Sequence, residues 1–476
     1  MIRKGIPLLF DNIYKAKMNG YFVLYNPYSY KGLLVINNRY WDIFNSINGE
    51  RNINDYLKLT KINRWLSKRN IFSFFNELQK ADIITFRNCR NYFHVSPKQS
   101  FSIDKSLTFW INLTNQCNFR CTYCFVEKKT RRMSKKTINL MVEKIFHEAL
   151  KYKIEFIGFN IAGGEPLLEV DLLKFLVLKI NSFRKRNFFK HIKVSTNITT
   201  NASLLTEKLA KFLKENGVSL SISIDGIGKY NDASRQFADG SGTYDYVIHG
   251  FKIAQKYKIL ANAICTITLK NISHVPTLVN FFQKQNINFI LHFYRKVSNS
   301  CKEQIIKYNK NLISSYKKAL RSIYRNYFRK NSNFSPFYQT RNKLLDMIVL
   351  FNNVSKYSCT AGLSYFSINA DGSITACPSD DRKIIANLND DNLLDTLRKQ
   401  RSSMVKNLSV EYKEKCYSCL WKYTCRSMCA LEKKYDTSDD KCLIIKELIP
   451  YIIKLEAERI IKANLKHMIN EEMSRN

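Results

Sequence analysis

Residues 107–124 read LTFWINLTNQCNFRCTYC, an apolar run that passes directly into three closely spaced cysteines. The first eight residues are rich in β-branched and aromatic types, which predicts a buried strand. Cys117, Cys121 and Cys124 then fall in the loop that follows this strand. In barrels of parallel strands, the loops after the strands build the active site. The stretch therefore predicts a strand that delivers three thiols to a functional site.

Strands and helices alternate along the chain after this stretch. We expect strands at 107–114, 154–162, 191–199, 218–225, 262–269 and 288–294, and helices after Ser134 and at 168–184, 204–215, 243–257 and 275–285. Such alternation is typical of parallel βαβ units. The glycine fingerprint of a dinucleotide-binding fold is missing. We therefore expect an α/β protein whose residues 101–300 form a partial (β/α)6 TIM-like barrel. Its strands are apolar nearly throughout, so we expect both faces of the sheet to be buried.

Four further regions surround the expected barrel. Residues 1–100 show two strands (21–27 and 32–38), three helices (from 39, 52 and 68) and a last strand at 82–86, the order of a small winged-helix-like domain. We expect a basic helical linker at 301–356, a cysteine-rich domain at 357–445 and a C-terminal helix at 446–476. SYFSINADGSITAC (364–377) predicts a hairpin that turns at Asp371-Gly372. Pro450 is expected to break or kink the last helical segment.

Composition limits the class of protein. Of 476 residues, 45% are hydrophobic and 24% charged, which is ordinary for a globular chain. No apolar run is long enough for a membrane span, and the N-terminus has no signal-peptide pattern, so we expect a cytoplasmic protein without a membrane partner. The 77 Lys and Arg exceed the 39 Asp and Glu by 38. This excess indicates either an anionic partner or a background rich in Lys, Ile and Asn.

Thirteen cysteines in a cytoplasmic chain indicate metal or redox chemistry rather than disulfides. Three thiolates at spacings of four and three can bind three corners of a 4Fe–4S cubane, whose fourth iron then stays open. A structural zinc site remains an alternative, but it needs a fourth ligand that this loop does not offer. Cys89, Cys265 and Cys301 stand alone and are expected to be buried bystanders.

The cysteine spacing, with Tyr123 before the last cysteine, resembles that of the radical S-adenosylmethionine superfamily. Later segments fit the same resemblance in the family's order: GGEP at 163–166, TTN at 199–201 and SIDG at 223–226. The resemblance implies that S-adenosylmethionine is bound by Tyr123, Gly163, Gly164, Glu165, Thr200, Asn201, Ser223 and Arg235. The glycine pair lets the backbone approach a ligand closely, and Arg235 suits the ligand's carboxylate. Ala202 stands where the family usually has glycine.

A second set of cysteines is similar to the seven-cysteine pattern of the SPASM domain. That resemblance implies two auxiliary 4Fe–4S clusters, one on Cys416, Cys419, Cys425 and Cys442 and one on Cys359, Cys377 and Cys429. The second group has only three cysteines, so we expect an open iron there. The spacing Cys416-x2-Cys419 alone also suits a zinc ribbon, which remains an alternative.

Residues 20–86 resemble, more weakly, the precursor-recognition domain of peptide-modifying enzymes, in which a leader peptide adds a strand to a sheet edge. The alternative is a DNA-binding winged helix, but no helix here concentrates Arg and Lys as a recognition helix does. A nucleic-acid partner is therefore not favoured.

Together the resemblances imply a radical oxidoreductase, a maturase that abstracts hydrogen from a ribosomally made peptide and forms a thioether or another crosslink. They imply the peptide's leader and core as partners, with a reductase, flavodoxin or ferredoxin as electron donor. An anaerobic sulfatase-maturing enzyme is the first alternative. Its family carries an Asp base directly after the hairpin cysteine, whereas this chain has Pro378. A zinc-containing DNA-binding regulator is the alternative from another class.

Overall fold

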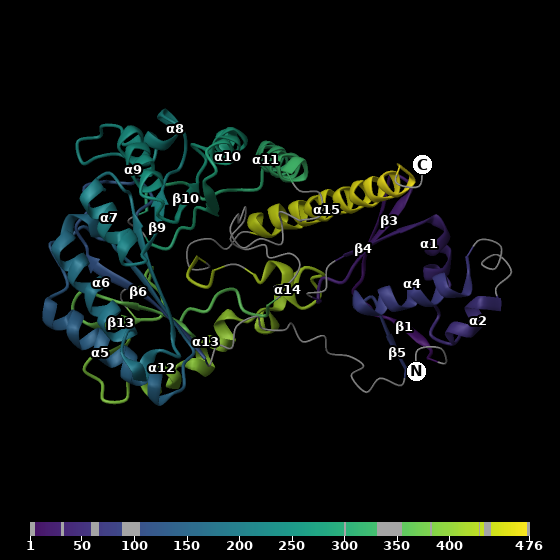
Figure 1. Ribbon diagram of the computed structural model, residues 1–476, viewed down its shortest axis with the longest axis horizontal. Coiled ribbons are helices and arrows are strands. Elements are labelled where there is room, and N and C mark those ends of the chain that lie inside the picture. The colour runs from purple at the N-terminus through teal and green to yellow at the C-terminus, as the bar shows by residue number, and fades with distance from the viewer. Residues whose placement is uncertain are drawn as a thin grey trace.

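The computed structural model describes residues 5–29, 33–58, 66–87, 105–298, 301–330, 355–380, 383–427, 429–432 and 439–473. A nine-stranded sheet forms its centre, with strand order β11-β10-β9-β8-β7-β6-β12-β13-β14. In Figure 1 this sheet and its covering helices occupy one end of the molecule, and the N-terminal elements occupy the other. Two smaller sheets, β2-β3-β4 and β1-β5, belong to the N-terminal elements.

Six neighbouring strands of the central sheet run parallel and confirm the expected alternation. They are β6 (Ser106–Thr114), β7 (Phe156–Gly163), β8 (Lys193–Thr200), β9 (Ser219–Ser223), β10 (Ala261–Ile267) and β11 (Asn288–Phe293). The intervening helices are α5 (Lys135–Lys151), α6 (Val170–Arg184), α7 (Glu207–Glu215), α8 (Lys229–Asp232), α9 (Tyr244–Lys256) and α10 (Val275–Lys284), with 3-10 turns η2 (Pro166–Glu169), η3 (Asn187–Phe189) and η4 (Ile272–His274). Ser134 caps α5 through its Oγ, which accepts a hydrogen bond from the Thr137 N–H at 3.0 Å.

The expectation that both faces of these strands are buried is wrong. Burial alternates along β6, β9, β10 and β11, so successive side chains belong to a buried face and a half-buried face. The buried face carries apolar residues such as Ile222 and Ile267, which join the same core as the helices. The other face carries polar residues such as Asn160 and Ser221. An open, curved sheet leaves its inner face accessible, and this face is free to receive a ligand.

The predicted hairpin at 364–377 forms and extends the barrel sheet. β12 (Tyr365–Ile368) pairs antiparallel with β13 (Ser373–Thr375) and parallel with β6, while β14 (Ile384–Asn387) adds the last strand. The turn uses Gly372 at φ 87°, a conformation that favours glycine. The remaining elements of this region are α12 (Leu393–Lys399), α13 (Arg401–Leu408), η6 (Val410–Tyr412), η7 (Glu414–Cys416) and α14 (Lys422–Cys425). The hairpin thus places Cys377, which follows β13, at the same sheet whose strand β6 leads into the first cysteine loop.

The N-terminal elements confirm the predicted hairpin and three helices. They are β3 (Tyr21–Tyr25), β4 (Leu33–Asn37), α1 (Asn38–Asn45), α2 (Ile53–Lys58), α4 (Lys68–Lys80) and β5 (Ile84–Phe86). The sequence interpretation missed β1 (Pro7–Leu9) and β2 (Tyr14–Met18). β2 pairs with β3, and β1 pairs with β5. We refer to the described residues 5–87 as the N-terminal unit. It has its own core of aromatic and aliphatic side chains.

The N-terminal unit packs against the second cysteine region. The rings of Tyr14 and Trp421 lie 5.2 Å apart, and those of Tyr28 and Tyr423 lie 4.8 Å apart, edge to face. Thr424 Oγ1 donates a buried hydrogen bond of 3.2 Å to the Pro27 carbonyl. These contacts fix the unit beside α14, between two of the predicted cluster ligands.

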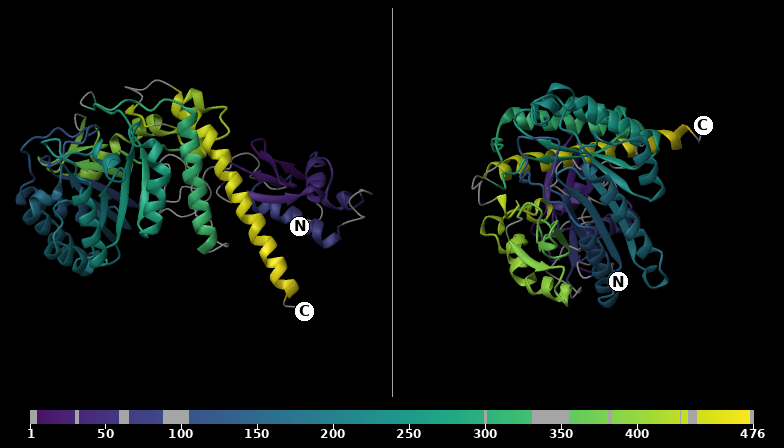
Figure 2. Two further views of the ribbon diagram at one scale, coloured as in Figure 1. Left: turned by 90° about the horizontal axis from the view of Figure 1, so that it is seen from above. Right: turned by 90° about the vertical axis from the view of Figure 1, so that its left-hand side faces the viewer.

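Two long helices connect the barrel with the N-terminal unit. α11 (Lys310–Lys330) lies on α10, and α15 (Asp440–Met473) runs beside α11 and on to β4. Figure 2 shows α11 and α15 side by side between the barrel and the N-terminal strands. The expected break at Pro450 is wrong, because α15 continues through it. Ile445, Ile449 and Ile453 are buried on this helix, and their packing offsets the lost backbone hydrogen bond.

The helix also begins at Asp440, so the domain boundary expected at 445/446 falls inside α15. Among the described helices, none combines the length and the apolar character that crossing a membrane requires.

Candidate active site

The first cysteine loop lies at the carboxyl end of β6 and is held by its neighbours on several sides. The Arg120 N–H donates to the Gln236 carbonyl at 2.7 Å, and the Thr122 N–H donates to Ser234 at 2.9 Å. Phe119 is buried and packs edge to face on Phe237, with ring centroids 5.0 Å apart. The loop therefore forms a short two-stranded contact with the segment that carries Arg235.

The glycine pair approaches this loop closely. The Gly164 N–H donates to the Thr114 carbonyl at 2.6 Å, and the Glu165 N–H donates to Gln116 at 2.7 Å. A Cβ on Gly164 would lie 1.9 Å from the Gln116 carbonyl oxygen, and one on Gly163, at φ +132°, would lie 2.2 Å from the Thr114 oxygen. The glycine pair was expected to let the backbone approach a ligand closely. In the structure both glycines lie close to the chain's own backbone. It fixes the end of β7 against the residue before Cys117.

Glu165 connects three strand ends. It is buried, and its carboxylate accepts from Thr200 Oγ1 at 2.5 Å and from the Asn201 N–H at 2.7 Å. Burial raises the pKa of Glu165, and these hydrogen bonds oppose the rise. Asn201 Nδ2 in turn donates to Asn118 Oδ1, at 2.9 Å, inside the cysteine loop. The carboxylate and amide side chains predicted for cofactor binding therefore also hold the loop in place.

Ala202, the departure from the family pattern, has φ 58°. This left-handed conformation costs a non-glycine residue about 1–2 kcal/mol, which is the physical reason for a glycine here. Two hydrogen bonds brace the loop: the Ala202 N–H donates to Thr200 Oγ1 at 2.9 Å, and the Ser203 N–H donates to Asn201 Oδ1 at 2.9 Å. The alanine therefore keeps the tight turn that the segment requires.

Tyr123, Asp225 and Arg235 form a buried polar cluster beside Cys121. The Tyr123 hydroxyl donates to Asp225 Oδ2 and accepts from Arg235 Nη1, and Arg235 Nη1 lies 3.5 Å from the same carboxylate oxygen. Asp225 Oδ1 accepts from the Thr266 N–H at 2.8 Å. Burial raises the pKa of Asp225, and the Arg235 charge opposes the rise.

Arg235 has unused hydrogen-bonding capacity in this cluster. Its Nε is buried and has no hydrogen-bond partner among the residues that the structure describes. An orphaned guanidinium donor at the carboxyl end of the sheet suits a ligand with a carboxylate, such as the methionine part of S-adenosylmethionine. Asp225 was not among the predicted site residues, although its place in the SIDG segment between strand and helix could have identified it.

The three thiols of the first loop sit in surroundings suited to metal-bound thiolates. Burial raises the pKa of Cys121 to about 12, and the nearby Arg235 charge opposes this rise. Burial also raises the pKa of Cys117, opposed by Lys128. Lys128 Nζ donates to Cys124 Sγ at 3.1 Å, and the Phe119 N–H donates to Cys117 Sγ at 3.4 Å. Donors aimed at sulfur, with cations close by, fit the negatively charged thiolates of an iron–sulfur cluster.

Among the described residues, no three His, Cys, Asp or Glu side chains converge as ligands of a single ion. A cubane does not require such convergence, since each thiolate binds a different iron. The donor set of the first loop therefore fits a 4Fe–4S cluster.

A row of polar side chains crosses the half-buried face of the sheet below this loop, and the sequence interpretation missed it. Trp110, Asn160, Asn197 and Ser219 are paired in register on β6 to β9, and Ser221 pairs with Asn262. Ser223 lies on the same face, at the end of β9, and is half-buried. These amides and hydroxyls can bind polar groups of a ligand that enters the inner face of the sheet. Alternation of polar and apolar residues along the strands was the available signal.

The structure brings the C-terminal cysteines into the two groups that were expected. Burial raises the pKa of Cys425 to about 12, and the thiols of Cys442, Cys419 and Cys416 add to the rise. Burial likewise raises the pKa of Cys377 to about 12, with Cys429 and Cys359 as contributing neighbours. Each group thus consists of thiols close enough to interact.

The solitary cysteines separate from these groups. Cys301 is buried, and its Sγ donates to the Tyr123 carbonyl at 3.4 Å, in the first loop. Cys265 lies in the core on β10. Cys89 falls outside the described residues.

Two family models match the chain. The radical SAM superfamily matches residues 111–282, and an iron–sulfur cluster-binding domain, SPASM, matches residues 359–420. The first covers β6 to α10 with the first cysteine loop, and the second covers the hairpin and the start of the second cysteine group.

Relatives and solved structures give the same picture. A cysteine-type anaerobic sulfatase-maturating enzyme of Clostridium perfringens is 25% identical over 341 residues, which cover 69% of this chain and 89% of the relative. A structure of anSMEcpe with bound AdoMet has a TM-score of 0.59 at 24% identity and covers 75% of this chain and 99% of its own. A structure of Streptococcus suis SuiB bound to precursor peptide SuiA has a TM-score of 0.50 at 16% identity. The match covers 91% of this chain and 98% of the SuiB chain. At these identities the structures show a shared fold.

Proposed function

The chain carries a radical SAM domain followed by a SPASM iron–sulfur domain and is therefore a radical SAM enzyme, and we propose that it modifies a ribosomally made peptide. Its cofactors are 4Fe–4S clusters and S-adenosylmethionine. When bound, they supply one-electron chemistry and the abstraction of a hydrogen atom from carbon. In this proposal Cys117, Cys121 and Cys124 hold the first cluster.

The other residues of the site bind, orient and exclude water. Arg235 binds the cofactor's carboxylate through its unused donor, and Ser223 offers a hydroxyl on the sheet's inner face at the end of β9. Gly163, Gly164, Thr200 and Asn201 place their backbone and hydroxyl groups around the rest of the cofactor. The polar row from Trp110 to Ser219 lies on the same inner face of the sheet. In this proposal it holds the peptide so that its reacting carbon lies near the bound cofactor.

The auxiliary clusters are proposed on the two C-terminal cysteine groups. Cys359, Cys377 and Cys429 supply three thiolates to a cubane that has four irons. The remaining iron is available to a substrate thiolate, whose pKa a metal lowers. This arrangement favours a thioether over simple oxidation, because the sulfur is held in position when the carbon radical forms.

The N-terminal unit favours a peptide over another class of substrate. The observation that carries the proposal is the edge of its sheet, to which a peptide strand can be added. β4 is an outer strand of its sheet, and beside it lies a hollow of about 370 Å³ lined by apolar Leu34, Ile36 and Phe74, and by Ser73. A leader peptide can add a strand to this edge and place side chains in the hollow. The shared fold with SuiB extends over 91% of the chain, whereas anSMEcpe covers 75%.

Maturation of a sulfatase is the second candidate, since the sulfatase-maturating relatives are 25–28% identical to this chain. Two features disfavour it. Pro378 follows Cys377, where the resemblance implies an Asp base in that family, and residues 1–100 are surplus to that family's pattern.

The test is co-expression with short peptides encoded beside the gene, followed by mass spectrometry. We expect a peptide that has lost two hydrogen atoms per new crosslink, because a C–H and an S–H are replaced by a C–S bond. An aldehyde that reacts with a hydrazide, formed on a sulfatase-derived peptide instead, would favour the second candidate and contradict the proposal.

A matched pair of variants tests the leader site. Ser73→Trp fills the hollow beside β4, whereas Arg69→Trp places the same ring on the exposed part of α4 outside the hollow. We expect Ser73→Trp alone to raise the KM for full-length precursor and to leave kcat for a leaderless peptide unchanged. Equal effects of the two variants would exclude this edge as the leader site.

A further inference from the structure

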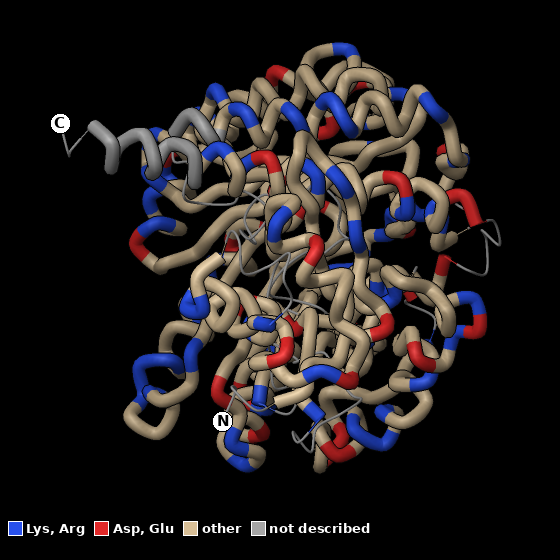
Figure 3. The backbone as a smooth tube through the Cα atoms, turned by 90° about the vertical axis from the view of Figure 1, so that its right-hand side faces the viewer, with Lys and Arg blue, Asp and Glu red and all other residues tan. Residues whose placement is uncertain are grey.

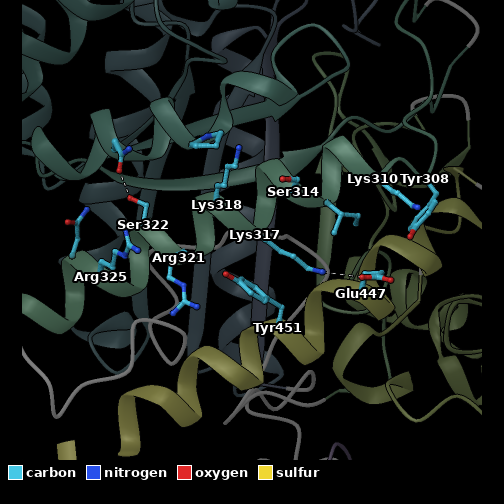
Figure 4. Close-up of a pocket in the computed structure, with 14 residues that line it drawn as sticks. Tyr308, Lys310, Ser314, Lys317, Lys318, Arg321, Ser322, Arg325, Glu447 and Tyr451 are labelled. Carbon is cyan, nitrogen blue, oxygen red and sulfur yellow. Dashed lines mark hydrogen bonds and ion pairs between the residues drawn. The ribbon is translucent and has the colours of Figure 1, made fainter. Parts of the chain in front are cut away.

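A second surface, away from the cofactor site, is built from the helix that the sequence left without a function. A cavity of about 870 Å³ lies over α11, with α10 on one side and α15 on the other. Figure 4 shows side chains of α11 along its length, with Tyr451 and Glu447 of α15 facing them. We call this hollow the α11 groove.

The α11 groove is strongly cationic. α11 has no acidic residue in its 21 positions. Lys317 Nζ lies 3.2 Å from a Glu447 oxygen, and Arg321 forms an ion pair with Glu458, so these two cations are neutralised. Lys310, Lys318 and Arg325 also line the groove, are exposed, and form no ion pair with any described residue.

The charge of this groove is a local feature within a generally basic molecule. Lys and Arg are spread over the side of the protein drawn in Figure 3, with Asp and Glu among them. In the groove, by contrast, three cations that form no ion pair with a described residue lie along one helix within a concave surface. A low-dielectric concave wall strengthens the attraction of such charges for an anionic ligand.

The groove continues toward the N-terminal unit. Lys317, Glu447 and Tyr451 also line a second hollow of about 460 Å³, whose other wall includes Ala16 and Lys17 of β2. At its other end, the Tyr308 N–H donates to Asp440 Oδ1 at 2.9 Å, two residues before Cys442. The path therefore leads from the sheet of the N-terminal unit to the second cysteine region.

We propose that the α11 groove binds an acidic stretch of a polypeptide, which under the proposed function is part of the precursor's leader. An extended chain fits a hollow between helices that continues to β2 and β3, across the sheet from the β4 edge. Its carboxylates meet Lys318 and Arg325, while its apolar side chains meet Ile313 and Tyr451. A globular electron donor is the other partner that a cationic surface suits, and the experiment below distinguishes it from a peptide.

The experiment measures binding by the full-length protein without any turnover. The probe is a fluorescein-labelled twelve-residue peptide of alternating Glu and Leu, and its counterpart has Lys in place of Glu. We compare Lys318→Glu/Arg325→Glu with Lys208→Glu/Lys211→Glu on the exposed face of α7, which changes net charge equally. We expect the groove variant to bind the Glu peptide about tenfold more weakly, since two attractions become repulsions.

We expect the α7 variant to bind the Glu peptide as the wild type does, and we expect the Lys peptide not to bind the wild type. Lys318→Gln/Arg325→Gln is expected to give an intermediate loss that higher salt reduces. Equal affinity in the groove and α7 variants overturns the inference. So does unchanged peptide affinity combined with slower reduction of the groove variant by a flavodoxin, which would assign the groove to the electron donor.

This outcome is separable from the proposed function. If the wild type binds the Glu peptide no better than the groove variant while crosslinking is intact, only the groove is contradicted. If the groove binds the Glu peptide but no modified precursor is found, only the proposed reaction is contradicted.

Discussion

Arg235 shows at the scale of one residue how the fold prepares a binding site. It is held by Tyr123 and Asp225, yet its Nε has no described partner. The structure uses Asp225 to keep the buried guanidinium charged and oriented. A charge held in this way loses little conformational freedom when a ligand carboxylate arrives.

Replacing Asp225 by Ala should therefore destabilise the protein. The variant leaves Arg235 buried without its counter-charge, which costs about 3–5 kcal/mol of unfolding free energy. Asp239→Ala is the control, because that carboxylate is exposed and bonds only within its own turn. Urea denaturation gives both values, and equal midpoints for the two variants would refute the role of Asp225.

The three cysteines of the first loop carry a second prediction. Cys117→Ala, Cys121→Ala and Cys124→Ala should each abolish formation of 5′-deoxyadenosine, since each removes one ligand of the proposed cluster. Circular dichroism should stay unchanged, because the loop is held by backbone hydrogen bonds to its neighbours. Chromatography of the reaction products tests this. Undiminished 5′-deoxyadenosine in any one variant would contradict the ligand assignment.

At the scale of elements, the meeting of β6, β7 and β8 determines the site. Their ends are joined by backbone hydrogen bonds at Gly164 and Glu165 and by the Asn201–Asn118 contact. The cysteine loop is therefore fixed before any cofactor binds. Its position depends on the absence of a side chain at Gly164, where the Gln116 carbonyl occupies the space.

Gly164→Ala should displace the loop. The added Cβ would meet backbone oxygen at 1.9 Å, and relieving this overlap costs about 1–3 kcal/mol. Gly158→Ala on β7, the strand that leads to Gly164, is the matched control, since its Cβ would lie 3.1 Å from a Thr108 side chain that can adjust. Iron content and absorbance near 400 nm should fall for Gly164→Ala alone. Similar iron content in both would show that the loop tolerates the shift.

The segment after β11 gives a prediction about the auxiliary clusters. Cys301 hydrogen-bonds the Tyr123 carbonyl in the first loop, and the thiols that interact with Cys377 are Cys429 and Cys359. Cys301→Ser should therefore leave the iron content unchanged, whereas Cys429→Ser should lower it. A loss of about four irons in the Cys301 variant, one cubane, would make Cys301 the missing fourth ligand and eliminate the open iron.

At the scale of the whole molecule, the hairpin β12–β13 and the helix α15 unite the parts. The hairpin joins the second cysteine region to β6, and α15 passes from Cys442 along α11 to β4. The N-terminal unit rests on α14 through Tyr14, Tyr28 and Pro27. The N-terminal unit, which we propose binds the leader, thus contacts the segment between Cys419 and Cys425, two of the proposed cluster ligands.

Loosening this contact should make the segment around α14 more mobile. Tyr14→Ala removes the ring that packs on Trp421, and the lost aromatic pair costs about 0.5–1.5 kcal/mol of docking free energy. Tyr412→Ala, at a 55% exposed position, is the control. Hydrogen exchange should become faster in residues 421–427 for Tyr14→Ala only. Unchanged exchange there would mean that the ring contact contributes nothing to holding the unit in place.

The sequence by itself determined the order of the barrel elements and the identity of the ligand types, although it did not reveal β1 and β2. Hydrophobic periodicity and helix caps are local, so all six parallel strands and the hairpin at Asp371-Gly372 were predictable. The cysteine spacings predicted both cluster-binding regions, because ligands close in sequence are close in space. The two groups within the second region came from a family resemblance, and the structure brings the same thiols together.

The features that depend on contacts between residues far apart in the sequence were decided by the tertiary structure alone. The alternation of polar and apolar residues marks two different faces of the strands, but only the folded sheet shows that Asn160 and Asn197 lie side by side on the half-buried one. Pro450 stays helical because packing against α11 and β4 outweighs a local preference. The role of Gly164 as a contact with Gln116, and the groove between α11 and α15, join segments far apart in sequence. No local pattern records such pairs, since they form only when the chain has folded.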